Sequence, residues 1–315
     1  LRDRATQESQ EEMVGALARQ METAQEMLSA DLDAPDLAEF LARYAGALQH
    51  LFPFQEAQIF LPSEEGEALV LHAAARAWGG DAVLAVTSDG ASLPTEELHL
   101  AARQAKALGV EHVSIRGGEL EIDAFRQHAP DRCFHCKDHL YERLVAMARE
   151  RDLPQVLDGA NADDVGDHRP GMVAATHHGV ISPLLRAGLT KPWVRALSKA
   201  YGLATWDKPA EACLSSRFPY GTEVTADGLD RVYRAERCLK ELGFATVRVR
   251  VHDPVARIEV PLADLPALLA PGIRERAVEG IKEAGFGYVA VDVEGFRSGS
   301  LNEGLEAGRS PLEDR

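Results

Sequence analysis

The feature that most constrains the fold is an alternation of short apolar runs with helical segments between residues 83 and 201. Strands are predicted at 83–87, 113–115, 156–158 and 180–181, and helices at 95–108, 138–150, 170–178 and 191–201. This order is typical of an α/β domain with a parallel sheet and right-handed crossovers. Ligands bind such sheets beyond the carboxyl ends of the strands. Two polar, Gly-containing segments, 87–90 and 158–164, are expected at such ends.

The segments on either side have different patterns. After residue 207 the chain predicts a small α+β domain, with a helix at 227–242, strands at 246–251, 257–260 and 288–293, and two helices across 262–283. The N-terminal part predicts helices at 10–28 and 37–51, then a hairpin whose strands are 58–61 and 68–71. We therefore expect three parts, which are residues 1–72, 73–206 and 207–315.

Composition excludes several classes of protein. The 34 Lys and Arg residues against 50 Asp and Glu residues give a net charge of −16, which disfavours nucleic acid as a partner. No apolar run is long enough to span a membrane, and the polar first fifteen residues do not resemble a signal peptide, so a cytoplasmic location is expected. Four cysteines in 315 residues favour redox or metal chemistry over a disulfide scaffold.

Three of the cysteines stand in polar segments. Cys133 and Cys136 form a CxxC pair, and Cys213 lies in a Pro- and Gly-containing stretch, whereas Cys238 falls on an amphipathic helix. A zinc site would need further ligands, such as His135, His139 or a distant cysteine, because structural zinc usually takes four. If Cys133, Cys136 and Cys213 converge, they suit a [4Fe-4S] cluster with one open iron. The alternative is a set of buried, inert thiols.

A second candidate site follows the strand predicted at 156–158. Its members are Asp158, Gly159, Asn161, Asp163 and Asp164. Carboxylate and amide oxygens suit Mg²⁺ together with a nucleotide phosphate. The same residue types also form ordinary turns and helix caps, and composition alone does not separate the two interpretations.

Arginines mark a third candidate site. Arg248 and Arg250 alternate with valines along one predicted strand, so both project from the same face. Together with Arg217 they suit a phosphate or carboxylate substrate, while the alternative is a solvated strand face paired with acids. Glu236, on the preceding helix, is expected to be a partner of these arginines or an acid of the site.

Several long motifs resemble one family. They are DRCFHCK at 131–137, LDGANADDVGDHRPG at 157–171, the segment 182–221 that contains DKPAEACLSSRFPYG, and FRSGSLNE at 296–303. Over residues 73–303 the chain resembles the LarE sulfur transferases, PP-loop proteins of nickel-pincer cofactor synthesis. The resemblance implies a Rossmann-like PP-loop domain that adenylates a pyridinium carboxylate mononucleotide with ATP and Mg²⁺. The activated oxygen is then replaced by sulfur to give a thiocarboxylate.

The resemblance also implies how the sulfur is carried. In one version of the chemistry the cysteine that matches Cys213 gives up its own sulfur and becomes dehydroalanine. In the other, three cysteines hold a [4Fe-4S] cluster, and the presence of Cys133 and Cys136 favours that version. LarE proteins often form oligomers, so a homo-oligomer is expected.

The arginine site also has counterparts in the family. Arg217 and Glu236 match positions around the reacting cysteine, and Arg248 and Arg250 match positions that bind the phosphate or carboxylate of the substrate.

One departure from the family concerns ATP. The family begins with a strand and an SGGVDS loop that binds pyrophosphate, whereas this chain has LPSEEGE at 61–67, with three glutamates that repel a triphosphate. Residues 36–73 resemble the opening of a GAF domain. We therefore expect a junction of the two families that has lost the first strand, unless 58–61 or 68–71 replaces it, and that binds ATP poorly.

Two other functions remain open from the sequence. One is a GAF-like sensory or interaction module whose C-terminal part is a non-catalytic scaffold. The other is a PP-loop tRNA thiolase, which requires a basic RNA-binding face, although residues 73–315 are net acidic.

Overall fold

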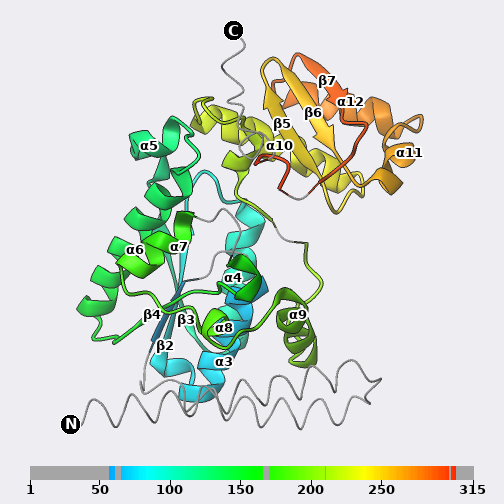
Figure 1. Ribbon diagram of the computed structural model, residues 1–315. Helices are drawn as coiled ribbons and strands as arrows, with labels where there is room; N and C mark the ends of the chain where they lie inside the picture. Colours follow the sequence, from blue (N-terminus) through cyan, green and yellow to red (C-terminus); the bar gives the residue numbers. More distant parts are fainter. Residues whose placement is uncertain (1–56, 61–64, 166–169, 210, 298, 303–315) are drawn as a thin grey trace, which may run out of the picture. The chain divides into compact units, whose positions relative to one another are not determined.

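The computed structural model describes residues 57–60, 65–165, 170–209, 211–297 and 299–302 (Figure 1). The helices predicted at 10–28 and 37–51 lie outside the described residues. The chain divides into two compact units that are discontinuous in sequence. The first comprises residues 1–88, 97–115 and 141–210, and the second 89–96, 116–140 and 211–315. None of the helices in the described ranges is both long and apolar enough to cross a membrane.

The first unit contains a four-stranded sheet in the order β3-β2-β1-β4. Its strands are β1 (Ala57–Phe60), β2 (Val83–Asp89), β3 (Glu111–Arg116) and β4 (Val156–Leu157). β1 pairs in parallel with both β2 and β4. The expected mixed α/β architecture with parallel strand pairs is therefore confirmed. The strand predicted at 180–181 is reduced to one bridge, between Ile181 and Leu157.

The hairpin predicted at 58–71 is wrong. Residues 57–60 do form a strand, but residues 68–71 belong to helix α3 (Glu65–Trp78). Leu69, Val70 and Leu71 are buried in the core, which explains why a continuous apolar run looked like a strand. The alternative that the strand predicted at 58–61 replaces the first strand is confirmed, because β1 occupies a central position in the sheet. The GAF resemblance relied on that hairpin.

Helices cover the two faces of this sheet. α3 and α4 (Thr95–Ala107) lie on one side and α6 (Arg132–Glu150) on the other (Figure 1). The remaining helices of the first unit are η1 (Gly80–Ala82), η3 (Ala162–Asp164), α7 (Pro170–His177), α8 (Pro183–Arg186) and α9 (Lys191–Ala200). Leu71 and Ala74 of α3 share one hydrophobic core with Val194 and Leu197 of α9.

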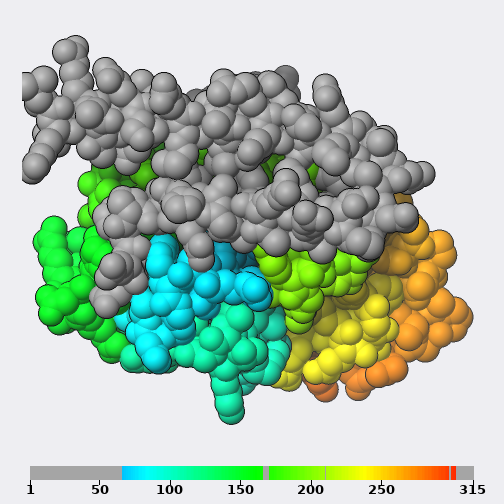
Figure 2. All heavy atoms as spheres, turned by 90° about the horizontal axis from the view of Figure 1, so that it is seen from below, coloured from blue at the N-terminus to red at the C-terminus, as the bar shows by residue number. Residues whose placement is uncertain are grey.

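The second unit is built around a three-stranded sheet in the order β5-β6-β7. Its elements are η2 (Glu119–Glu121), α5 (Asp123–Arg126), η4 (Leu214–Arg217), α10 (Ala226–Glu241), β5 (Arg248–His252), β6 (Val255–Glu259), η5 (Leu262–Asp264), α11 (Leu265–Leu268), α12 (Ile273–Glu283) and β7 (Tyr288–Val291). β5 and β6 are antiparallel, and β6 and β7 are parallel. Figure 2 shows the atoms of α11 and α12, in orange, at the surface of this unit.

Apolar periodicity explains how α10 docks on this sheet. Thr225 caps the helix, since its hydroxyl accepts a hydrogen bond from the Gly228 amide. Leu229, Val232 and Leu239 recur at helical spacing and are buried against the valines of β5. The core of the second unit therefore fixes both the helix that carries Glu236 and the strand that carries the arginines.

Candidate functional site

The structure distributes the predicted site residues over the two units. The second unit contains Cys133, Cys136, Cys213, Arg217, Glu236, Arg248 and Arg250. The first unit contains Asp158, Gly159, Asn161, Asp163 and Asp164. The three cysteines and the arginines therefore belong to the second unit, and the acidic loop belongs to the first.

The three cysteines interact electrostatically. Burial raises the pKa of the Cys136 thiol, and negative charge on Cys213, Glu119 and Cys133 raises it further. Cys213 is exposed, whereas Cys133 and Cys136 are half-buried in the first turns of α6. Among the described residues, no three His, Cys, Asp or Glu side chains are gathered closely enough to hold a metal ion. The structure thus brings the thiols into one region without forming a finished metal site.

A buried arginine faces these thiols. Arg132 is 3% exposed, its Nε donates to the Ser215 hydroxyl at 3.4 Å, and its guanidinium lies 5.9 Å from the centre of the Tyr220 ring. Burial alone would lower the pKa of Arg132, but negative charge on Cys213 and Cys133 raises it overall. Arg132 is therefore close enough to Cys213 and Cys133 to interact with a thiolate at either position.

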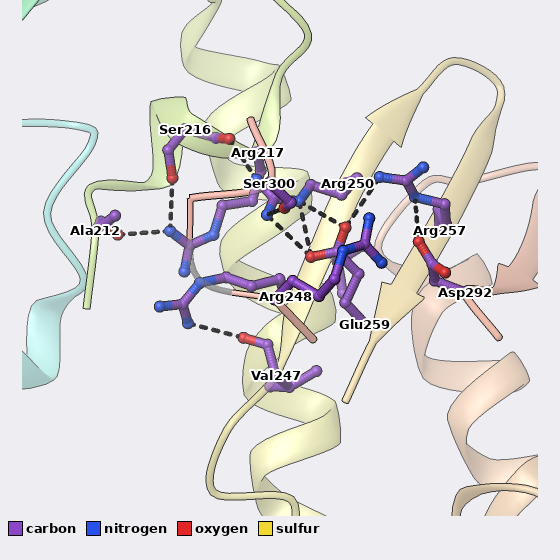
Figure 3. Close-up of polar contacts among 12 residues, drawn as sticks. Ala212, Ser216, Arg217, Val247, Arg248, Arg250, Arg257, Glu259, Asp292 and Ser300 are labelled. Atoms are coloured by element: carbon purple, nitrogen blue, oxygen red, sulfur yellow. Dashed lines mark hydrogen bonds and ion pairs between the residues drawn. The ribbon is translucent and has the colours of Figure 1, made fainter. Parts of the chain in front are cut away.

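The segment that carries Cys213 is held by an ion pair. Arg217 is 1% exposed; its Nε and Nη2 donate to the two carboxylate oxygens of Glu236 at 2.8 and 2.9 Å. Its Nη1 donates to the Ala212 carbonyl and to the Ser216 hydroxyl (Figure 3). The same nitrogen also donates to the Cys213 carbonyl. Arg217 thus orients the backbone on both sides of the exposed sulfur. The Cys213 Sγ lies 2.9 Å from the Ser215 hydroxyl.

Arg250 is largely engaged within the protein. Its Nε and Nη2 contact the Glu259 carboxylate at 2.9–3.0 Å, and its Nη1 donates to the Ser216 carbonyl at 2.8 Å (Figure 3). Arg257 also contacts Glu259 at 2.9 Å. Strand register explains this network, because β6 presents its acid beside the arginines of β5. Sequence reasoning missed Glu259, although its place on the neighbouring antiparallel strand was a usable signal.

Arg248 has a different environment. It is 6% exposed, and burial together with repulsion by Arg217 lowers its pKa to about 10. Its Nη1 donates to the Val247 carbonyl, and the Phe296 ring lies 5.3 Å from its guanidinium carbon. Negative charge on Glu236 and Glu211 acts in the opposite direction and raises this pKa. Arg248 is therefore a buried cation with partners in the protein, and its role toward a substrate anion remains a prediction.

The segment after β7 closes over this region. The Ser300 hydroxyl accepts a hydrogen bond from Arg250 Nη2 at 2.9 Å, and the Asn302 amide oxygen accepts one from the Tyr220 hydroxyl at 2.9 Å. Ser300 and Asn302 therefore connect the FRSGSLNE motif with Arg250 and with the aromatic ring beside Arg132.

Two further positioning residues were missed by sequence reasoning. His128 is fully buried with a backbone φ of 55°, and its Nδ1 is 2.8 Å from the Pro219 carbonyl, which ties the segment before α6 to the one after η4. Glu119 is 5% exposed and accepts hydrogen bonds from the Ser92 amide and hydroxyl, both at 2.9 Å. The Ser92 carbonyl in turn accepts from the Leu214 amide, next to Cys213.

In the first unit, the acidic loop is internally bonded. Asp158 accepts from the Tyr141 hydroxyl at 2.9 Å, and Asn161 and Asp164 form a capping box at the start of η3. Asp163 accepts from the Lys191 amide at 2.6 Å. These contacts match the helix-cap alternative, and the Mg²⁺ role remains a prediction.

Gly159 and the start of α3 are in direct contact. A Cβ on Gly66 would lie 2.1 Å from the Gly159 carbonyl oxygen, so the two backbones touch. Glu67 is 3% exposed, and its Oε1 accepts a hydrogen bond from the Gly159 amide at 3.2 Å. A glutamate of the LPSEEGE segment therefore interacts with the first glycine of the predicted nucleotide loop.

Comparison with known proteins identifies the family. No model of a known protein family matches the chain. It is 38% identical over 237 residues to the pyridinium-3,5-bisthiocarboxylic acid mononucleotide synthase of Lactiplantibacillus plantarum, covering 75% of this chain and 85% of that protein. This chain belongs to the LarE family of sulfur transferases. An uncharacterised protein of Synechocystis is 40% identical over 226 residues, covering 72% of this chain and 84% of its own length.

A more distant similarity links this LarE-family chain to an uncharacterised protein of Methanocaldococcus jannaschii, which is 27% identical over 179 residues. The resemblance inferred from the motifs is confirmed, and with it a sulfur-transferase enzyme. The roles of the individual LarE-type residues remain predictions, which the contacts described above make specific.

Proposed function

We propose that this chain transfers sulfur to an activated carboxylate of a pyridinium mononucleotide and so produces a thiocarboxylate for nickel-pincer cofactor synthesis. The observation that carries the proposal is the buried Arg217–Glu236 pair, which holds the carbonyls on both sides of an exposed Cys213 sulfur. It is supported by 38% identity to a synthase whose name specifies this product. A homo-oligomer in the cytoplasm remains an expectation.

The contacts of the residues in the second unit suggest a separate role in sulfur transfer for each of them. Cys213 presents sulfur to the substrate, and this sulfur shares a hydrogen bond with the Ser215 hydroxyl at 2.9 Å. Arg248 binds the phosphate or carboxylate of the mononucleotide, as the family resemblance implies, and the positive charges of Arg217 and Arg250 beside it add to the attraction of an anion. Arg217 and Arg250 are positioning residues, since Glu236 and Glu259 engage them.

The thiols of Cys133, Cys136 and Cys213 are a suitable donor set for a [4Fe-4S] cluster, and Arg132 is placed to balance its negative charge. When bound, such a cluster supplies an iron that carries an additional sulfide. The protein's own contribution is to hold Cys133 and Cys136 half-buried and to keep Cys213 exposed to the substrate.

The test is anaerobic sulfur transfer by the full chain after reconstitution with iron and sulfide. The substrate is supplied both as the carboxylate with MgATP and as its prepared acyl adenylate, and the thiocarboxylate is measured by mass spectrometry. Cys213→Ala should abolish the product, whereas Cys238→Ala, at a cysteine on α10, should retain it. Equal product from both variants would refute the role of Cys213.

The same assay identifies the sulfur source. A cluster predicts several turnovers and dependence on Cys133 and Cys136. Sacrificial transfer predicts one turnover, after which the chain has lost the mass of hydrogen sulfide at Cys213. Absence of thiocarboxylate with either form of the substrate would refute the proposed function.

A further inference from the structure

A row of cations lies on the outer side of one helix of the first unit. Lys191, Arg195 and Lys199 recur every four residues along α9 and are all exposed. Val194 and Leu197, on the opposite side of this helix, are buried in the core that it shares with α3. Side chains four residues apart lie on one face of a helix. The three cations therefore form one surface, the α9 basic face.

The surroundings of the α9 basic face are poor in negative charge. Residues 170–206 contain four Lys or Arg residues and no Asp or Glu, in a chain whose net charge is −16. Lys191 Nζ lies 3.8 Å from a carboxylate oxygen of Asp164, but the lysine side chain is still 46% exposed. Burial raises the pKa of Tyr201, which follows α9, and the positive charge of Arg76 opposes that rise, so Arg76 lies beside the end of the helix. An acidic molecule thus has a positively charged surface here.

The N-terminal segment of the chain has the opposite charge. Residues 1–56 contain 11 Asp or Glu residues and 4 Lys or Arg residues, which gives a net charge of −7. Along the helix predicted at 10–28, Glu22 follows Glu11 by eleven residues and Glu26 follows Glu22 by four, which are close to three turns and one turn of α-helix. These carboxylates therefore share one side of the predicted helix. Rows of opposite charge on two helices are complementary along their length.

The chain leads from this segment to the end of α9. β1 begins at Ala57, which is aligned with Val83 at the start of β2, and α3 runs back between the two parallel strands. The second half of α3 is therefore close to the sheet end at which the chain enters β1. His72 lies in that half, and its ring is 4.6 Å from the ring of Tyr201, just after α9. The 28 residues between Leu28 and Ala57 can span α9, a helix of 10 residues and about 15 Å.

We propose that the acidic side of residues 10–28 docks on the α9 basic face of the same chain. An exposed ion pair contributes little by itself, so a free peptide of this sequence would bind weakly. The segment is covalently joined to the first unit, and this raises its effective concentration at α9. The docked segment then occupies a surface that would otherwise attract nucleic acid or an acidic protein.

Carbodiimide crosslinking of the full chain tests the contact. The reagent joins a lysine amine to a carboxylate in direct contact with it, as an amide, with loss of water. Peptide mass spectrometry should find Lys191 and Lys199 joined to glutamates of residues 10–28. The yield should fall at least roughly threefold between about 0.1 and 1 M salt, because the Debye length shortens from about 10 to about 3 Å. Lys282, an exposed lysine of α12 in the second unit, is the internal control and should not couple to this segment.

Charge exchange identifies the groups in contact. Reversing the charges of the α9 basic face should remove the crosslinks, and reversing the charges of the acidic side of residues 10–28 should do the same. The chain with both reversals should form them again, with amines and carboxylates exchanged between the two partners. The two sets of substitutions are Lys191→Glu with Arg195→Glu and Lys199→Glu, and Glu11→Lys with Glu22→Lys and Glu26→Lys. Circular dichroism shows which variants are folded, and the wild-type crosslinks test the proposal without any of them.

Mixed isotopes distinguish contacts within one chain from contacts between chains. Chains labelled with heavy nitrogen and unlabelled chains are mixed before crosslinking, and each crosslinked pair of peptides should carry a single isotope. Pairs that join labelled to unlabelled peptides would assign the occupant to a second copy of the chain and overturn the proposal. Absence of wild-type crosslinks to residues 10–28, or a yield no higher than that of Lys282, would overturn it as well. Failure of a folded, doubly reversed chain to form the crosslinks again would have the same consequence.

Discussion

The Arg217–Glu236 pair allows the most exact test of how the site is held together. Both side chains are almost fully buried, at 0% and 4% exposure, and two parallel hydrogen bonds join them. Glu236→Gln keeps the size of the side chain and removes its charge. The variant leaves the Arg217 guanidinium buried without its counter-ion, so the second unit should be destabilised and the backbone around Cys213 released.

The expected magnitude follows from the desolvation of the charge left behind. Removing one partner of a buried ion pair costs about 3–5 kcal/mol. Glu236 Oε1 also accepts a hydrogen bond from the Val249 amide at 2.9 Å, which places the estimate toward the upper end. Replacing both partners by apolar residues, as in Arg217→Met with Glu236→Leu, should cost less than Glu236→Gln alone, because no charge is then left buried.

The assay must report on the second unit. All three tryptophans, at positions 78, 193 and 206, lie in the first unit. Their fluorescence therefore reports on the unfolding of the first unit and not of the second. Hydrogen exchange of peptides from α10 measures the opening free energy of the second unit directly. Asp230→Asn breaks an exposed pair with Arg234 on the same helix and should change that free energy by less than about 1 kcal/mol.

If Glu236→Gln lowered the opening free energy of the second unit by less than about 1 kcal/mol, the reasoning would be refuted, because the loss of an exposed ion pair has an effect of that size. Equality between the double variant and the sum of its two single variants would refute it as well, because independent effects are additive.

Three further predictions concern the second unit. Gly280→Ala should destabilise it by about 1–3 kcal/mol, because the added Cβ would lie 2.2 Å from the Cys238 sulfur; adding Cys238→Ala should recover part of the loss in the same exchange assay. Burial lowers the pKa of His128 to about 4, so this group contributes stability above pH 6.5 that is lost as pH falls through 4, in total about 3 kcal/mol. When the free energy of unfolding in urea is measured against pH, His128→Asn should lack this pH-dependent contribution. An unchanged pH dependence in the variant would contradict the prediction. Glu119→Ala should leave the Ser92 donors unpaired and lower the opening free energy of residues 89–96, measured by hydrogen exchange, by about 1–3 kcal/mol. Unaltered exchange would show that the contact is unimportant.

Periodicity and turn chemistry predicted most elements of the fold. The helix expected at 227–242 is found at Ala226–Glu241, because its apolar spacing and its Thr225 cap are local signals. The run 68–71 was misread because four consecutive apolar residues suit a buried strand or a buried helix equally. Its true state depends on packing against α9, which the local sequence does not contain.

Some contacts of the candidate site could be anticipated from the sequence, whereas the roles of its residues remain predictions. Cysteines and clustered arginines stand out in an acidic chain, and Glu236 was anticipated as an arginine partner. Glu259, Glu119 and His128 were missed because no local motif marks them, and only strand register or backbone contacts from distant segments give them a role. The contact between Glu67 and Gly159 likewise joins residues far apart in sequence.

The second unit is assembled from separate stretches of chain, and this affects its biosynthesis. At about 5–20 residues per second, the roughly 80 residues between Cys136 and Cys213 take on the order of 4–16 s to emerge from synthesis. During that interval the CxxC thiols belong to a nascent chain that lacks Arg217, Glu236 and the whole C-terminal sheet. Iron delivered at this stage would meet only two of the three thiols of the proposed cluster, so the proposal predicts that cluster insertion follows translation.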